Sequence, residues 1–107
     1  MPHHLLTAHA DVATDAPARY AKQLLAHLGR KLEFTTHGAT STARIGDATA
    51  EVTIGDGVLT LRATSADEQG LATVEDVLGR HLESFGQRAG LVVTWVRTPT
   101  VDAEEPA

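Results

Sequence analysis

The sequence predicts a two-layer α+β sandwich, with two helices on one face of a mostly antiparallel sheet. The first observation is the order of hydrophobic patterns, which gives strand, helix, three strands, helix, strand. The second is the short glycine-containing connections between the middle strands, since such connections favour antiparallel hairpins. The third is the length, because 107 residues suffice for one domain with one core but not for two ordinary domains.

A change of hydrophobic period marks the first strand and the first helix. Four apolar residues alternate with polar ones, as in a strand with one buried face: Leu6, Ala8, Ala10 and Val12. Asp15 is a cap-like residue before Ala16-Pro17, and proline is favoured in the first turn of a helix. The helix is expected to run to Leu28, because Gly29 is a natural stop.

Three strands are expected between the two helices. The first covers Leu32 to Ile45 and contains a turn at His37-Gly38. The second covers residues 48–54, and the third covers residues 59–63. Between them, Gly55-Asp56-Gly57 is a strong hairpin signal, because glycine accepts positive φ without a steric penalty. The opposite faces of these strands carry mostly Thr, Glu and Arg, as a solvated face does.

The second helix is expected to begin after Ser65 or Asp67 and to end near Gly86 to Gly90. Its buried stripe consists of five residues at helical spacing: Leu71, Val74, Leu78, Leu82 and Phe85. The last strand should run from Leu91 to Arg97. Because it is apolar on both faces, we expect it to be central in the sheet or covered on both sides.

Composition excludes several classes of protein. A hydrophobic fraction of 42% and a charged fraction of 21% suit a soluble globular domain. The chain has no cysteine, which excludes disulfides, thiolate metal sites, iron–sulfur clusters and a cysteine nucleophile. The net charge of −5 argues against duplex nucleic acid as a partner. No apolar run of ~18 residues and no secretory leader is present, so we expect a cytoplasmic protein with no membrane contact.

The ends of the chain are expected to lie outside the fold. Residues 1–4 are predicted to be flexible, residues 5–98 to form one α+β domain, and residues 99–107 to form an acidic disordered tail. The tail contains Asp102, Glu104 and Glu105. Without them nine basic residues face eleven acidic ones, which leaves a net charge of −2 for the folded domain.

Histidines are the first candidates for chemistry, since the chain has six. His27 and His81 each lie at the edge of a predicted helix stripe, so they can approach each other where the helices meet. One interpretation is a two-histidine metal site or a proton-handling pair. The other is two boundary histidines that hydrogen-bond locally, since no carboxylate motif accompanies them. Separately, a free Pro2-His3-His4 terminus can hold Cu(II) or Ni(II).

The two helices differ in charge, which offers a second kind of site. The first helix and its end are basic through Arg19, Lys22, Arg30 and Lys31. The second is acidic through Asp67, Glu68, Glu75, Asp76 and Glu83. This difference either favours packing of the helices side by side or makes the acidic helix a docking surface for a basic partner. Trp95 is either a core residue or an aromatic pocket wall, with Tyr20 as its companion.

Catalytic motifs are missing. No Gly-x-Ser-x-Gly sequence surrounds a serine, and the glycine pairs resemble turns, not phosphate-binding loops. We therefore expect no catalytic residues and no cofactor.

Two segments together resemble a bacterial family. Residues 19–31 resemble its "R-Y-x-K-Q-L-x-x-H-x-x-x-K" helix, and His81 to Trp95 resemble its closing "H-L-x-x-F … L-x-x-x-W" segment. The family is known as domain of unknown function 2218, and the resemblance covers residues 7–97. The family-type positions that it transfers are Tyr20, Lys22, His27, Lys31, His81, Phe85 and Trp95.

The resemblance implies a link to iron, because family members stand alone or beside siderophore-interacting flavoprotein reductase domains. One departure concerns the chemistry. Members often carry a cysteine shortly after the glycine that matches Gly46, and here the nearby residue is Ala48. A thiol-dependent role is therefore not expected of this chain.

Three hypotheses of function follow. The first is a non-enzymatic accessory or ligand-binding domain linked to iron or siderophore handling. Its binding residues would be drawn from Tyr20, Lys22, His27, Lys31, His81 and Trp95. The second is a protein-interaction module, which docks through its acidic helix or its exposed sheet face onto a flavoprotein reductase or onto itself as a homodimer. The third is an enzyme with His27 or His81 as general base, which requires a pocket between the helices.

Overall fold

The computed structural model describes residues 5–87 and 90–99. The predicted flexible segment 1–4, with the amino-terminal copper or nickel site, lies outside the described residues, and so do residues 100–107 of the predicted tail. The elements in chain order are β1 (Leu6–Ala13), α1 (Pro17–Leu28), β2 (Thr35–His37), β3 (Thr40–Ile45), β4 (Ala48–Ile54), β5 (Val58–Ser65), α2 (Glu68–Phe85) and β6 (Val96–Pro99).

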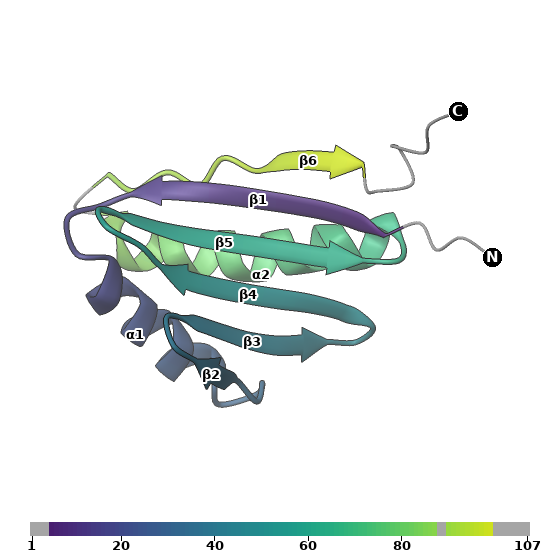
Figure 1. Cartoon of the computed structure of the whole chain (residues 1–107), viewed down its shortest axis with the longest axis horizontal. Helices are drawn as coiled ribbons and strands as arrows, with labels where there is room; N and C mark the ends of the chain where they lie inside the picture. Colours follow the sequence, from purple (N-terminus) through teal and green to yellow (C-terminus); the bar gives the residue numbers. More distant parts are fainter. Residues whose placement is uncertain (1–4, 88–89, 100–107) are drawn as a thin grey trace.

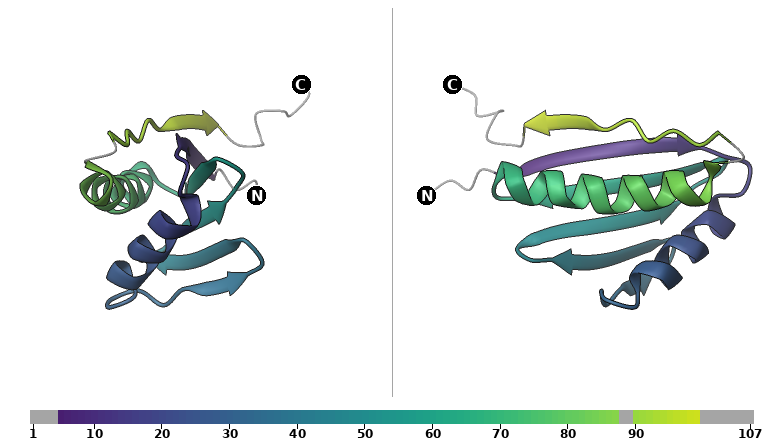
Figure 2. Two further views of the ribbon diagram at one scale, coloured as in Figure 1. Left: turned by 90° about the vertical axis from the view of Figure 1, so that its left-hand side faces the viewer. Right: turned by 180° about the vertical axis from the view of Figure 1, so that it is seen from behind.

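The six strands form one sheet in the order β2-β3-β4-β5-β1-β6 (Figure 1). Every pair of neighbouring strands is antiparallel. Both helices lie on the same face of this sheet, as the left-hand view of Figure 2 shows. The predicted two-layer α+β sandwich is therefore confirmed.

Four strands lie between the helices, so the prediction of three was wrong. Gly38 has a φ of 63°, and it begins a two-residue loop between the paired residues His37 and Thr40. Positive φ at this position suits the twist of a tight hairpin. The predicted first strand is therefore folded into two, β2 and β3. Leu32 and Phe34 precede β2 and pack against the core instead of pairing in the sheet.

A row of four alanines crosses the sheet beneath the helices. Ala8 pairs with Ala63, Ala63 with Ala50, and Ala50 with Ala43, so the row spans β1, β5, β4 and β3. All four are buried. Their small side chains let the helices lie close to the sheet, and larger residues fill the space on either side. The fully buried large residues are Leu24, Leu59, Leu61, Leu71, Leu78, Leu82, Val12, Val52 and Val74.

The capping residue at the start of α2 agrees with its prediction, whereas the one at the start of α1 does not. Asp67 caps α2, and its Oδ1 accepts a hydrogen bond of 2.7 Å from the Gly70 amide. The N-cap of α1 is Ala16, which has no side chain able to cap, so the prediction of Asp15 as the capping residue was wrong. Instead, the Thr14 hydroxyl accepts a hydrogen bond from the Ala16 amide, and Pro17 begins the helix as predicted.

The last strand differs most from its prediction. β6 is shorter than expected and forms an edge of the sheet, where it pairs with β1 alone. Residues 91–95 lie outside the sheet, on the side of α2 (Figure 2). Their apolar side chains pack against α2 where glycines leave room for them. Val93 and Trp95 contact Gly79 inside the helix, and Leu91 contacts Gly86 directly after its end. β6 also includes Pro99, the first residue of the predicted tail.

Candidate functional site

A hollow of about 470 Å³ lies where the end of α1 meets the middle of α2 and the end of β3. We call it the histidine hollow. Its lining residues are His27, Leu28, Arg30, Lys31, Leu32, Ile45, Val77 and His81. Four are apolar, two carry full positive charges, and two are the histidines predicted to meet between the helices. The pocket that the enzyme hypothesis required is thus present in the described structure.

The two histidine rings are in contact. Their centroids are 4.9 Å apart, and the ring planes are inclined by 42°. Phe85 presents an edge-on contact to His27, at 5.5 Å between centroids and 78° between planes. His81 is half-buried and His27 is exposed. The predicted approach of the two histidines is confirmed by these distances.

A backbone hydrogen bond fixes the proton of His81. Nδ1 of His81 lies 2.7 Å from the carbonyl oxygen of Val77, one turn earlier in α2. A carbonyl oxygen can only accept, so Nδ1 must carry the proton and donate it. In the neutral ring, Nε2 then holds a free lone pair. His81 therefore offers a ligand one nitrogen, which accepts a hydrogen bond when the ring is neutral and donates one when it is charged.

The end of α1 places the cationic side of the hollow. After Gly29, the chain stays coiled against the helix end, because the Leu28 carbonyl accepts hydrogen bonds from the amides of Lys31 and Leu32, at 3.0 and 2.8 Å. This turn brings Arg30 and Lys31 to the mouth of the hollow and turns Leu32 toward its floor. Both cations are exposed, whereas Leu32 is half-buried.

The histidine pair has few additional metal ligands. Within residues 5–87 and 90–99, no group of three or more His, Asp or Glu side chains is placed to hold a metal ion. Glu83, two residues after His81, accepts a hydrogen bond from the Val93 amide at 2.9 Å. It lines a different hollow. The described residues therefore place no third His, Asp or Glu ligand beside the two histidines.

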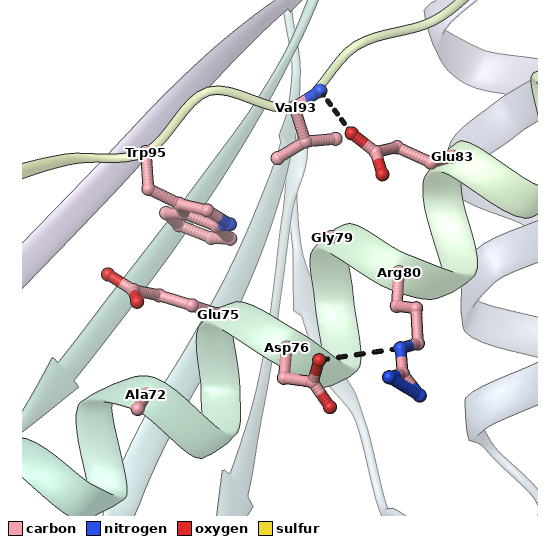
Figure 3. Close-up of a pocket in the computed structure, with 8 residues that line it drawn as sticks. All are labelled: Ala72, Glu75, Asp76, Gly79, Arg80, Glu83, Val93 and Trp95. Carbon is pink, nitrogen blue, oxygen red and sulfur yellow. Dashed lines mark hydrogen bonds and ion pairs between the residues drawn. The ribbon is translucent and has the colours of Figure 1, made fainter.

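A second hollow, of about 440 Å³, contains Trp95 (Figure 3). We call it the tryptophan hollow. The indole lies beside Gly79, and the lining includes three carboxylates, each with a partner. Glu75 binds Arg97 at 2.9 Å, Asp76 is 3.4 Å from Arg80, and Glu83 accepts the Val93 amide. The lining residues are Ala72, Glu75, Asp76, Gly79, Arg80, Glu83, Val93 and Trp95.

Sequence comparison decides the family. A family model described as "Uncharacterized protein conserved in bacteria (DUF2218)" matches residues 9–96. The chain belongs to the DUF2218 family. Among curated proteins, none matches this DUF2218 chain. The resemblance identified from the two sequence segments is thus confirmed.

Two solved structures resemble this DUF2218 domain. One is an NMR structure of PA4090 from Pseudomonas aeruginosa, with 26% sequence identity and a TM-score of 0.67, covering 87% of this chain and 95% of that one. The other is the de novo designed protein Foldit4, with 11% identity and a TM-score of 0.51, covering 91% of this chain and 99% of that one. The likeness to the designed protein concerns the fold alone.

The family-type positions fall into four places in the DUF2218 domain. His27, Lys31 and His81 line the histidine hollow, and Phe85 supports it through its contact with His27. Trp95 lies in the tryptophan hollow. Tyr20 is buried in the core, with the Arg19 guanidinium 5.7 Å from its ring centroid.

Tyr20 and Trp95 therefore do not share either hollow. Lys22 is exposed on α1 and lines neither hollow. Of the six predicted binding residues, the structure brings together His27, Lys31 and His81.

Sequence reasoning missed five residues of the hollow. Arg30 was predicted only as part of the basic end of the first helix, and no site role was predicted for the apolar lining residues. The sequence Arg30-Lys31 directly after Gly29 could have indicated the cationic side of the hollow, because it places two positive charges at the end of one helix. Nothing in the sequence placed Ile45 opposite them, since that contact depends on how α1 crosses the sheet. The missed residues are Leu28, Arg30, Leu32, Ile45 and Val77.

Proposed function

We propose that this chain is a non-enzymatic ligand-binding domain and that its small-molecule ligand occupies the histidine hollow. The observation that carries the proposal is the make-up of that hollow: an apolar lining, two histidines in contact and two cations at one mouth. Its volume of about 470 Å³ falls within the roughly 300–1,000 Å³ usual for small-molecule sites. A few polar groups against an apolar wall are the usual pattern of such sites.

The lining favours binding over catalysis. Its described residues include no hydroxyl nucleophile and no carboxylate that can orient a histidine base or act beside it. The Nδ1 atom of His81 is bonded to a backbone carbonyl, which fixes the ring without activating it. General base catalysis by Nε2 of His81 is the chemistry that this arrangement leaves open to an enzyme.

A ferric siderophore is the first ligand that we propose to test. Ferric catecholate complexes are anionic and partly aromatic, so they suit a cationic mouth and an apolar wall. The resemblance given under Sequence analysis, which implies siderophore-interacting reductase domains beside related chains, motivates this choice and the proposal of a flavoprotein reductase as partner. We also propose a cytoplasmic location, where such reductases work. Within the described residues, no helix is both long and apolar enough to cross a membrane.

The experiment is a titration of the protein with gallium(III) siderophores, Zn(II) and Cu(II), followed by NMR of the histidine ring signals. Gallium(III) replaces iron(III) because it is diamagnetic. We expect the signals of His27 and His81 to move while that of His9, on the open sheet face, stays fixed. A Leu32→Trp variant should fill the hollow and abolish the shifts, and Val92→Trp at an exposed site is its control. Unmoved His27 and His81 signals with every probe would contradict the iron-linked proposal.

A second candidate function rests on the uncovered face of the sheet. Both helices lie on one side (Figure 2), so the other face presents the outward residues of the strands, with Arg62 3.9 Å from Glu51. We propose docking of a partner protein or a second copy through this face or through the acidic α2. Light scattering after size-exclusion chromatography separates the candidates: a dimer that Arg62→Glu abolishes supports docking, and a monomer supports the hollow.

A further inference from the structure

We infer that the ligand of the histidine hollow is an amphipathic oxyanion, with a carboxylate or phosphate head at Arg30 and Lys31 and an apolar body against Leu32, Ile45 and Val77. This inference rests on the proposed function, because it names the chemical class of ligand that the same hollow takes.

The charge of the histidine hollow is the reverse of the protein's. The chain carries a net charge of −5, yet the described residues that line the hollow include Arg30, Lys31 and two histidines but no carboxylate. The four other hollows described in the structure all include at least one Asp or Glu. A concentration of positive charge in one concave place favours negatively charged ligands over neutral and cationic ones.

The two cations are available to a ligand. Within the described part of the chain, no carboxylate is paired with Arg30 or Lys31. Arg97, by contrast, is held by both Glu75 and Glu68. Neighbouring cations without counter-ions repel each other, and an oxyanion between them relieves that repulsion. A guanidinium and an ammonium are also the usual side chains that bind carboxylate and phosphate oxygens.

One feature of the helix works in the opposite direction. The carboxyl end of α1 carries a partial negative charge, which disfavours an anion. That charge is reduced here, because the amide of Gly29 donates to the Leu25 carbonyl and the amides of Lys31 and Leu32 donate to the Leu28 carbonyl. Two full positive charges exceed the remaining fraction of one negative charge, so the net field at the mouth is positive.

The apolar lining determines the rest of the ligand. Leu32, Ile45 and Val77 are half-buried and belong to the group of side chains that pack against the core. Their exposed surface lies in the hollow, where an alkyl or aromatic group can cover it. Burying such surface contributes about 25 cal/mol per Å². A small inorganic anion leaves this surface wet, so the hollow suits a ligand with both a charged and an apolar part.

The test uses four probes: octanoate, octyl phosphate, 1-octanol and octylammonium. Their dissociation constants are measured by NMR titration, from the amide signals of residues 27–32. We expect octanoate or octyl phosphate to bind about 3- to 10-fold more tightly than 1-octanol, as one or two exposed charge pairs allow. Octylammonium should bind most weakly. Octyl phosphate, 1-octanol and octylammonium share the same octyl chain, so the differences among these three report the head group, whereas octanoate has an alkyl chain shorter by one CH2 group, which is worth about 0.8 kcal/mol when buried.

Variants of the two cations test whether the anionic head group binds at Arg30 and Lys31. Lys31→Met combined with Arg30→Gln should bring the anionic probes to the affinity of 1-octanol and leave 1-octanol itself unchanged. Lys22→Met, on the same helix outside the hollow, is the matched control and should change nothing. Equal affinity for all four probes would overturn the inference while the hollow remained a binding site. No binding by any probe would count against both the inference and the proposed function.

Discussion

Gly79 is the residue on which the path of the last segment depends. A Cβ atom at this position would stand 3.0 Å from Nε1 of Trp95 and 3.4 Å from Cγ1 of Val93. The glycine therefore allows residues 91–95 to lie close on α2, although glycine costs about 1 kcal/mol relative to alanine inside a helix. The close packing of the indole accounts for a glycine in the middle of an 18-residue helix.

Substitution of Gly79 should separate helix propensity from packing. We expect Gly79→Ala to be nearly neutral, because the gain in propensity of about 1 kcal/mol offsets a tight contact. Gly79→Leu should destabilise the fold by about 1–3 kcal/mol, as overpacking does, and should shift the emission of Trp95, the single tryptophan. Urea denaturation followed by that emission measures both effects. Ser84→Leu, exposed on the same helix, is the control. Equal stability of the two leucine variants would show that the contact is not tight.

Gly57 tests a turn without a packing effect. Its φ is 70°, and no atom lies within 4 Å of the position that a Cβ would occupy. Any cost of a side chain must therefore come from the backbone, at about 1–2 kcal/mol for an L-residue in the left-handed region. We expect Gly57→Val to lower the free energy of unfolding by at least that amount, and Gly57→Asn by less, because asparagine tolerates this region. A denaturant midpoint equal to wild type for the valine variant would contradict this account.

Among the elements, β6 depends most on side chains for its position. It is short and pairs only with β1, while Arg97 reaches from it to α2. The guanidinium binds Glu75 through two hydrogen bonds, of 2.9 and 3.0 Å, and Glu68 through one of 3.0 Å. The hydrogen bond to Glu75 raises the pKa of Arg97 above its ordinary value, with burial opposing and the charges of Glu75 and Glu68 reinforcing the shift. Because a raised pKa favours the charged form at every lower pH, Arg97 stays cationic until the solution is strongly alkaline.

Removal of Arg97 should loosen β6 specifically. In Arg97→Gln we expect faster hydrogen exchange at the amides of residues 96–98, and unchanged exchange in β4 and β5. Arg80→Gln is the matched control, because Arg80 pairs with Asp76 on the same helix and both side chains are mostly exposed. Equal exchange of residues 96–98 in wild type and in Arg97→Gln would show that pairing with β1 is sufficient to hold the strand.

Some of the strands could be predicted from the sequence alone, and others could not. The alternation of apolar and polar residues predicted β1, β4 and β5 correctly, because each of these strands has one face on the core and one face in solvent. It failed at residues 91–95, where an apolar pattern arises from packing on a helix and not from burial in a sheet. It also missed the β2–β3 hairpin, because the exposed residues of β2 carry no alternation of burial. The meeting of His27 and His81 was predictable from the helix stripes, whereas the part that Ile45 plays required the tertiary structure.

At the scale of the whole molecule, stability should come from the single layer of side chains between helices and sheet. Leu78 is fully buried in that layer, so we expect Leu78→Ala to destabilise the fold by about 2–5 kcal/mol. Val92 is 66% exposed, and Val92→Ala should change stability by no more than about 0.5 kcal/mol. Thermal and urea unfolding measure the pair. A loss below about 1 kcal/mol for the leucine variant would place the core elsewhere.

The central claim is that ligand binding occurs in the histidine hollow, and the chain provides an internal control for it. It has two isoleucines: Ile45 lines the hollow, and Ile54, at the end of β4, does not. The decisive measurement is a methyl NMR spectrum of protein labelled at the isoleucine δ1 carbons, recorded during titration with octanoate. We predict a saturable shift of the Ile45 signal with the Ile54 signal unchanged. A fixed Ile45 signal, or equal movement of both signals, would contradict the claim.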